Sequence, residues 1–107
     1  MIKVSILYPN LPGRRFDIDH YLTVHMPLSI ERLGPSMRSI TVELGVSPGP
    51  PWPDAAFVAA AHFVCESREA YEAAFFTHMA ELEADMPNYT DIEAVIQISE
   101  IAIDSEG

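Results

Sequence analysis

Cysteine and positively charged residues are scarce in this chain. Cys65 is the only cysteine among 107 residues, so no internal disulfide can form. Six lysines and arginines stand against sixteen aspartates and glutamates, which gives a formal net charge of −10. An acidic surface of this kind repels phosphate backbones and anionic lipid headgroups. We therefore expect neither a nucleic acid nor a membrane surface as a partner.

Long apolar runs and several familiar motifs are also missing. No apolar stretch approaches the roughly 20 residues that are needed to span a bilayer. The start, MIKVSILYPN, lacks the long apolar run of a signal peptide, so we expect a cytoplasmic location. The sequence contains no glycine-rich phosphate loop, nucleophile elbow or paired-cysteine motif. These absences argue against nucleotide-dependent, hydrolase and metal-thiolate chemistry.

Apolar residues and prolines are abundant. Apolar residues make up 49% of the chain, and nine prolines mark its loops, which is typical of a folded globular protein. The length allows one modest core. We therefore expect a single domain over residues 1–107.

The stretch 16–35, FDIDHYLTVHMPLSIERLGP, has the pattern of a helix. Tyr21 and His25 stand one turn apart on the same helical face. Pro27 lies too deep in the pattern for a first-turn proline, so it removes an amide donor and crowds the carbonyl of Thr23. We therefore expect a kink beside His25.

The ends and the buried side of this helix can also be predicted. Asp17 or Asp19 can cap its start, and Gly34 with the following proline ends it. The expected apolar stripe consists of Leu22, Met26, Ile30 and Leu33.

Four segments alternate with the period of a strand, and a second helical segment lies between the last two. The expected strands are residues 2–8, 38–46, 57–65 and 92–103, and the second helix runs from 68 to about 86 after a cap at Ser67. Its expected apolar stripe is Ala70, Ala74, Phe75, Met79 and Leu82. The proline-rich stretch 47–54 around Trp52 must be a loop.

This order predicts an α+β fold, a ferredoxin-like βαββαβ arrangement with a four-stranded antiparallel sheet. Right-handed crossovers place both helices on one face of the sheet. The other face is too apolar to remain uncovered, so we expect a homodimer with the two sheets face to face. This open face should carry Lys3, Ser5, Leu7, Thr41, Val58, His62, Val64, Val95, Gln97 and Ile101.

Several motifs resemble those of the EthD family of dimeric α/β-barrel proteins. They are FDxxxYxxxHMP with the LGP that ends the first helix, HFVCESREAY at the second helix, and DMPNYTDIEAVIQISEI near the end. The resemblance implies a ferredoxin-like monomer, a dimer that closes a β-barrel, and a pocket between sheet and helices. It also implies a role in oxidative or degradative metabolism, such as ether breakdown. In several branches of the wider superfamily, the histidine matching His25 acts as acid or base.

His25 is the candidate catalytic residue, with Tyr21 as its partner. A neutral imidazole can take a proton from an enol, a phenol or a carbon acid near neutral pH. Tyr21 or Tyr89 can then hydrogen-bond the resulting oxyanion, with no metal or bound cofactor. The alternative interpretation is that His25 only satisfies the carbonyl of Thr23 or Tyr21 that the proline frees.

The other candidates concern ligand binding. Trp52 can fold over the pocket as a lid or simply pack on its neighbouring prolines, and Tyr89 can reach the pocket or pack under the second helix. Phe63 is a further expected ligand contact, because it aligns with a strand cysteine of the isomerase branch. His62 lies on the expected dimer face, Cys65 in the core, and His78 with Glu81 has no recognised metal motif.

Two functions of different classes remain open. The first is a small cofactor-independent enzyme, an oxidoreductase, isomerase or cyclase that uses His25 as acid or base. The second is a non-catalytic accessory protein that holds a small organic intermediate or product for a partner oxidative enzyme. Replacing the imidazole separates them, since it abolishes turnover in the first case and only alters affinity in the second.

Overall fold

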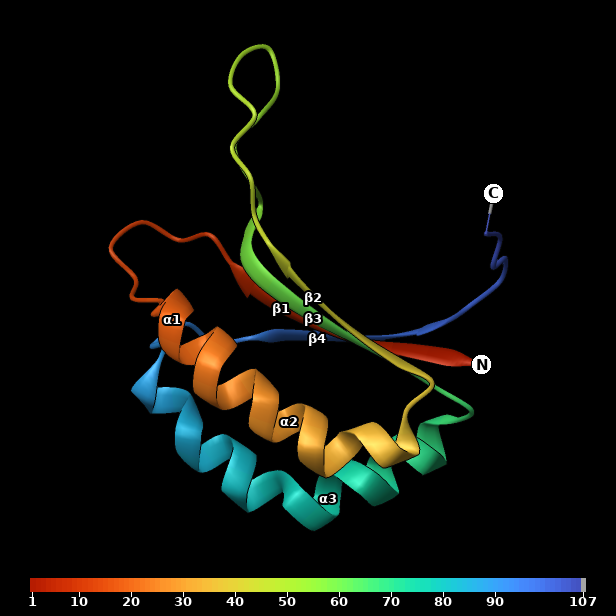
Figure 1. The fold of residues 1–107 in the computed structure, drawn as a ribbon. Helices are drawn as coiled ribbons and strands as arrows, with labels where there is room; N and C mark the ends of the chain where they lie inside the picture. The colour runs from red at the N-terminus through yellow and green to blue at the C-terminus, as the bar shows by residue number, and fades with distance from the viewer. Residues whose placement is uncertain (107) are drawn as a thin grey trace.

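The computed structural model describes residues 1–106, and it confirms the α+β, ferredoxin-like architecture. Both helical segments cover one face of the sheet, and the opposite face is open (Figure 1). In chain order the elements are β1 (Ile2–Pro9), α1 (Ile18–His20), the π-helical turn η1 (Tyr21–His25), α2 (Met26–Leu33), η2 (Gly34–Ser36), β2 (Ser39–Leu44), β3 (Phe57–Cys65), α3 (Arg68–Asp85), η3 (Met86–Asn88) and β4 (Val95–Glu100).

The four strands form one antiparallel sheet in the order β2-β3-β1-β4. Val4 on the central strand pairs with Phe63 on one side and Ile98 on the other. Ser5, the next residue, pairs with His62 and Gln97. Because successive side chains alternate between faces, this register confirms the predicted division of the strands into a helix-covered and an open face.

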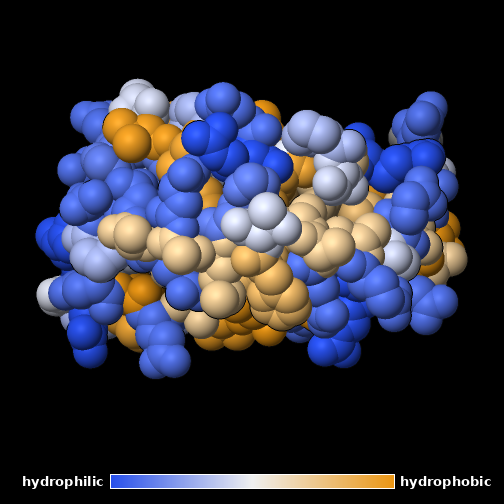
Figure 2. All heavy atoms as spheres, turned by 90° about the horizontal axis from the view of Figure 1, so that it is seen from below, coloured by the Kyte–Doolittle hydropathy of each residue, from blue (hydrophilic) through white to orange (hydrophobic). Residues whose placement is uncertain are grey.

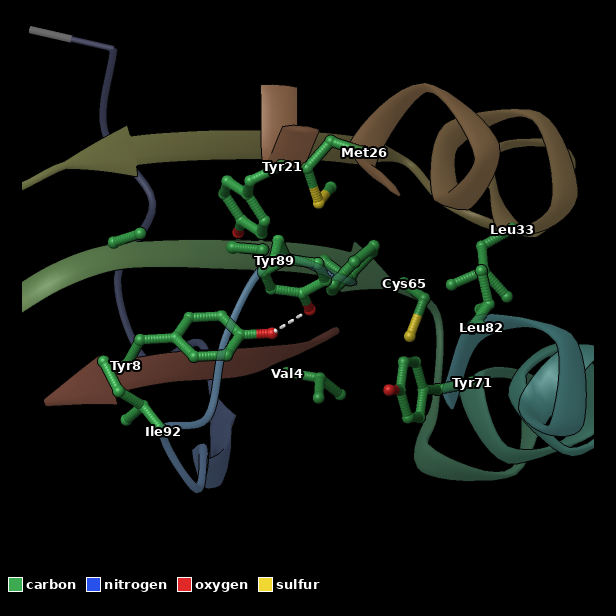
Figure 3. Packing of buried hydrophobic residues seen from close by; sticks show 13 residues of the cluster. Val4, Tyr8, Tyr21, Met26, Leu33, Cys65, Tyr71, Leu82, Tyr89 and Ile92 are labelled. Atoms are coloured by element: carbon green, nitrogen blue, oxygen red, sulfur yellow. Dashed lines mark hydrogen bonds between the residues drawn. The ribbon is translucent and has the colours of Figure 1, made fainter. Parts of the chain in front are cut away.

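The core lies between the helices and the covered face of the sheet. Val4 and Cys65 are fully buried there, and Leu33 and Leu82 close the layer from the two helical segments (Figure 3). Within residues 1–106, no helix is long and apolar enough to cross a bilayer.

The first helical segment contains a π-helical turn, η1, directly before its proline. The Asp17 carboxylate caps its start, accepting from the His20 amide at 3.1 Å, as the sequence predicts. In η1 the Met26 amide donates to the carbonyl of Tyr21, five residues back. The helical backbone runs without a break from Ile18 to Leu33, so Pro27 lies inside the helix as expected. The π-helical turn directly before Pro27 is the irregularity that the structure places beside His25.

The expected apolar stripe of the first helix is only half right. Leu22 and Ile30 are 40% and 47% exposed, so they face outward. Figure 2 shows the helical side of the molecule, where a band of apolar residues crosses the surface between hydrophilic ones. Apolar residues occur on two neighbouring faces of this helix, the predicted stripe and the face that carries Tyr21 and His25. The extra residue of the π-helical turn η1 changes which of these faces packs on the sheet. The buried residues are Tyr21, His25, Met26, Ser29 and Leu33.

The second helix follows the prediction more closely. The Ser67 hydroxyl accepts from the Ala70 amide at 3.1 Å, which confirms the cap. Leu82 is buried as expected, but Tyr71, absent from the predicted stripe, is buried as well. At the last strand, the predicted start at residue 92 is three residues too early, because Thr90 bonds to Arg15 in the β1–α1 loop instead of joining the sheet.

Candidate functional site

A cavity of about 270 Å³ lies between the covered face of the sheet and the helical layer. Its walls come from β1, η1, α2, β3, α3 and the stretch leading into β4. Most lining side chains are apolar or aromatic. The complete lining consists of Ile6, Tyr8, Tyr21, His25, Met26, Ser29, Leu33, Ala61, Phe63, Tyr71, Phe75, Leu82, Glu83, Met86, Ile92, Glu93, Ala94 and Ile96. A small, mainly apolar cavity with a few polar groups is the usual form of a site for a small organic ligand.

His25 stands on the cavity wall and is bonded to a carboxylate from the other helix. Its Nδ1 lies 3.0 Å from Oδ2 of Asp85, the last residue of α3. The Asp85 carboxylate also takes His20 Nε2 at 2.9 Å and the Asn88 amide at 3.0 Å, both on Oδ1. Three donors from two segments therefore hold the carboxylate in place behind the imidazole.

This arrangement sets the tautomer of His25. A carboxylate can only accept a hydrogen bond, so Nδ1 carries the proton and Nε2 of the neutral ring keeps its lone pair. Burial lowers the pKa of His25, and the bond to Asp85 opposes this only in part. Burial raises the pKa of Asp85, but the bonds from Asn88, His20 and His25 outweigh it and leave that pKa below its usual value. At neutral pH the pair is a neutral base backed by an anion.

Tyr21 and Tyr89 contact the His25 ring, and Tyr8 contacts both of these tyrosines. The hydroxyls of Tyr8 and Tyr89 bond to each other at 2.7 Å (Figure 3). Tyr21 is only 1% exposed, and within residues 1–106 its hydroxyl is the one buried side-chain polar atom without a partner. Burial raises the pKa of Tyr21, so the phenol stays protonated. Its ring stacks on His25 with centroids 6.1 Å apart.

The structure brings together four of the five predicted site residues. His25, Tyr21 and Phe63 line the cavity. Tyr89 does not line it, but its ring centroid is 4.5 Å from that of His25. Trp52 is 68% exposed in the β2–β3 loop, which projects away from the body of the subunit, and it does not line this cavity (Figure 1).

The interpretation of His25 as a group that merely satisfies a freed carbonyl is wrong. The Tyr21 carbonyl receives the Met26 amide, and Nδ1 of His25 bonds to Asp85. The imidazole is thus held by a side chain of the other helix, which leaves its second nitrogen available to the cavity.

Asp85 and His20 are the site residues that sequence reasoning missed. Asp85 belongs to the DMPNYTD motif, yet it is 60 residues from His25 in the chain, and no local spacing links the two. A carboxylate in the last turn of a helix, where the macrodipole disfavours it, was the available signal. His20 lies one position before Tyr21 and 65 residues from Asp85 in the chain, so no local spacing links it to the carboxylate either.

The remaining titratable clusters do not form metal sites. Among the described residues 1–106, no group of three or more His, Cys, Asp or Glu side chains could hold a metal ion. Glu81 bonds to Arg32 at 2.8 Å. His62 lies on the open face as predicted, with Nδ1 2.7 Å from the Ser5 hydroxyl and Nε2 2.9 Å from Glu43.

Comparison with known proteins agrees with this architecture. Residues 14–93 match the EthD domain family. The chain belongs to the EthD family. A solved structure of an EthD-like protein from Ralstonia eutropha JMP134 shares 42% identity, covers 98% of this chain and 95% of its own, and superposes with a TM-score of 0.88.

A second solved structure is more distant. It is an ethyl tert-butyl ether d (EthD) family protein from Bacillus halodurans C-125, with 22% identity, coverage of 94% of this chain and 97% of its own, and a TM-score of 0.69. At that identity the likeness shows the fold alone. No functionally curated protein matches this chain.

Proposed function

We propose that this EthD-family protein binds a small oxygenated organic compound in the cavity and transfers a proton with His25, as part of oxidative or degradative metabolism. The observation that carries the proposal is the His25–Asp85 pair on the cavity wall, with Nδ1 committed to the carboxylate. The hydrogen bond from Nδ1 to a fixed carboxylate sets the orientation of the ring and leaves Nε2 as the nitrogen that can accept a proton. Histidine bases are oriented in this way in general.

The proposed reaction needs only groups of this chain. Nε2 of His25 takes a proton from a carbon next to a carbonyl group, the electron pair of that C–H bond forms a C=C bond, and the π pair of the carbonyl group moves onto its oxygen. The enolate oxygen accepts a hydrogen bond from the Tyr21 hydroxyl. Return of the proton to the same or another carbon gives exchange or isomerisation. The apolar walls strengthen both hydrogen bonds by excluding water.

The test is deuterium exchange into a small ketone. The wild-type protein and the variant His25→Gln are incubated in deuterated water with 2-indanone, whose methylene protons are activated by the carbonyl, and the loss of proton signal is followed by NMR. We expect the wild type to accelerate exchange above the buffer rate and His25→Gln to lose about 100-fold or more of that acceleration. His62→Gln is the matched control and should retain it.

Other outcomes decide against the proposal. If wild type and His25→Gln both bind 2-indanone without exchange, the accessory-protein function replaces catalysis. If none of the three ketones 2-indanone, acetophenone and cyclohexanone binds, the cavity is not a site for small oxygenated compounds.

We also propose that the open face of the sheet packs against a second copy of the chain. Val95 is 49% exposed on this face, and Leu7, Val58 and Val64 are half-buried, so the face offers apolar area to a partner. Light scattering at micromolar concentration should give the mass of a dimer. A Val64→Glu variant, which places a carboxylate in this face, should shift the mass toward the monomer.

A further inference from the structure

We propose that the cavity selects uncharged carbonyl compounds of one-ring to two-ring size and rejects carboxylates of the same shape, with the Tyr21 hydroxyl as the donor to the carbonyl oxygen. This inference rests on the proposed binding function and adds the chemical class of the ligand.

The first support is the unpaired hydroxyl of Tyr21. Tyr8 and Tyr89 satisfy each other at 2.7 Å, whereas Tyr21 lines the cavity and its buried hydroxyl has no partner among the described residues. A buried hydroxyl without a partner is costly, and an entering acceptor removes that cost. A carbonyl oxygen only accepts hydrogen bonds, so it satisfies Tyr21 without bringing a new donor into an apolar cavity.

The second support is the charge of the walls. Glu83 and Glu93 are the charged side chains that line the cavity, both are exposed to solvent, and no lysine or arginine among residues 1–106 lines it. The Asp85 carboxylate lies directly behind His25, and burial disfavours the protonated form of that imidazole. An anionic ligand would therefore be buried beside an imidazole that an anion already backs, with no cationic side chain on the walls to serve as its counter-ion, which is a costly way to bury a charge.

The third support is the placement of the two polar groups. Tyr21 and His25 come from the same turn, η1, and their rings are nearly parallel, with an angle of 14° between planes. Both side chains line the same cavity. A carbonyl oxygen on the Tyr21 hydroxyl thus brings the adjacent carbon to the part of the cavity that His25 borders.

The test compares three compounds of the same skeleton: 2-indanone, the hydrocarbon indane, and indane-2-carboxylate. Affinities are measured by amide chemical shift perturbation for the wild type, for Tyr21→Phe and for the control His62→Gln, whose side chain lies on the open face of the sheet. We expect indane-2-carboxylate to bind at least about 100-fold more weakly than 2-indanone. Tyr21→Phe should weaken 2-indanone about tenfold and leave indane unchanged, and His62→Gln should change neither.

Three results would overturn the inference. They are carboxylate binding within tenfold of the ketone, equal 2-indanone affinity in wild type and Tyr21→Phe, and an equal loss of 2-indanone affinity in Tyr21→Phe and His62→Gln. Binding of all three compounds with equal affinity removes the selectivity but leaves the binding function standing, whereas no binding of any compound removes both. The wild-type comparison of ketone and carboxylate decides the question even if a variant fails to fold.

Discussion

Two histidine–carboxylate pairs occupy opposite faces of the same sheet. His25 bonds to Asp85 at 3.0 Å within the helix-covered layer, and His62 bonds to Glu43 at 2.9 Å on the open face. The distances are alike, but the surroundings differ. The Asp85 side chain is 13% exposed and the Glu43 side chain 59%.

The second nitrogen of each ring makes the larger difference. In His62 both nitrogens are engaged, since Nδ1 also bonds to the Ser5 hydroxyl at 2.7 Å. In His25, Nδ1 is the ring nitrogen that has a partner among the described residues, and the ring borders a cavity. A histidine–carboxylate bond alone therefore does not indicate a base. A second nitrogen without a partner, on a ring that lines a cavity, is the additional requirement.

The largest contrast should appear when the carboxylates are neutralised. Asp85→Asn removes the anion that two histidines and Asn88 share, so it should lower the free energy of unfolding by about 2 kcal/mol. Glu43→Gln affects an exposed pair and should cost less than about 0.5 kcal/mol. Urea unfolding of both variants measures this, and equal losses would show that the two pairs are energetically equivalent.

The hydroxyl beside each histidine should give effects of opposite sign. Tyr21→Phe removes an unpaired buried hydroxyl and should raise the free energy of unfolding by about 1 kcal/mol. Ser5→Ala removes a bonded hydroxyl and should lower it by about 1 kcal/mol. Thermal or urea unfolding of the ligand-free proteins measures both, and destabilisation by Tyr21→Phe would mean that its hydroxyl is already satisfied.

The pH dependence of stability should report the burial of His25. Because burial lowers its pKa, the folded protein binds fewer protons at this ring than the unfolded chain, whose histidines titrate near about 6.5. The resulting stability is complete above that value and is lost as the pH falls through the folded-state pKa. Urea midpoints between pH 7.5 and 5 should fall less steeply for His25→Gln than for wild type, and identical slopes would contradict the assignment.

The smallest effect concerns His20, which shares the carboxylate with His25. The positive charge that His20 can carry adds to burial in lowering the pKa of His25. His20→Gln keeps an amide donor near Asp85 but removes that charge, so the pKa of His25 should rise. An NMR titration of the ring measures it. His62→Gln, on the other face of the sheet, is the control and should leave the pKa of His25 where it is in the wild type.

Much of the fold could be predicted because strand alternation and helix caps depend on residues that are close together in the sequence. The parity of Ser5 and His62 placed both on the open face, and Ser67 marked the start of α3. The errors arose where a distant segment competed with local pattern. Thr90 bonds to Arg15 and not to the sheet, and η1 inserts a residue that changes which row of the helix is buried.

The candidate site was predictable only in part. Tyr21 and His25 share a helical turn, and the motif around them pointed to a base and its partner. Asp85 was not predictable, because its bond to His25 spans 60 residues and depends on how α3 ends beside η1. The position of Trp52 depended in turn on the direction in which the β2–β3 loop leaves the sheet (Figure 1).

The sequence by itself therefore determined the order of elements, the faces of the sheet, the family resemblance and the two residues of η1 that border the cavity. The order of elements and the faces of the sheet follow from spacing over a few residues, where backbone geometry leaves few choices. The cavity and the place of Tyr21 and His25 on it were what the family resemblance implied. Only the tertiary structure decided that Asp85 backs His25, that Tyr21 keeps an unpaired hydroxyl, and that no cation lines the cavity within the described residues. Those facts depend on side chains from different elements meeting in three dimensions, which local spacing does not encode.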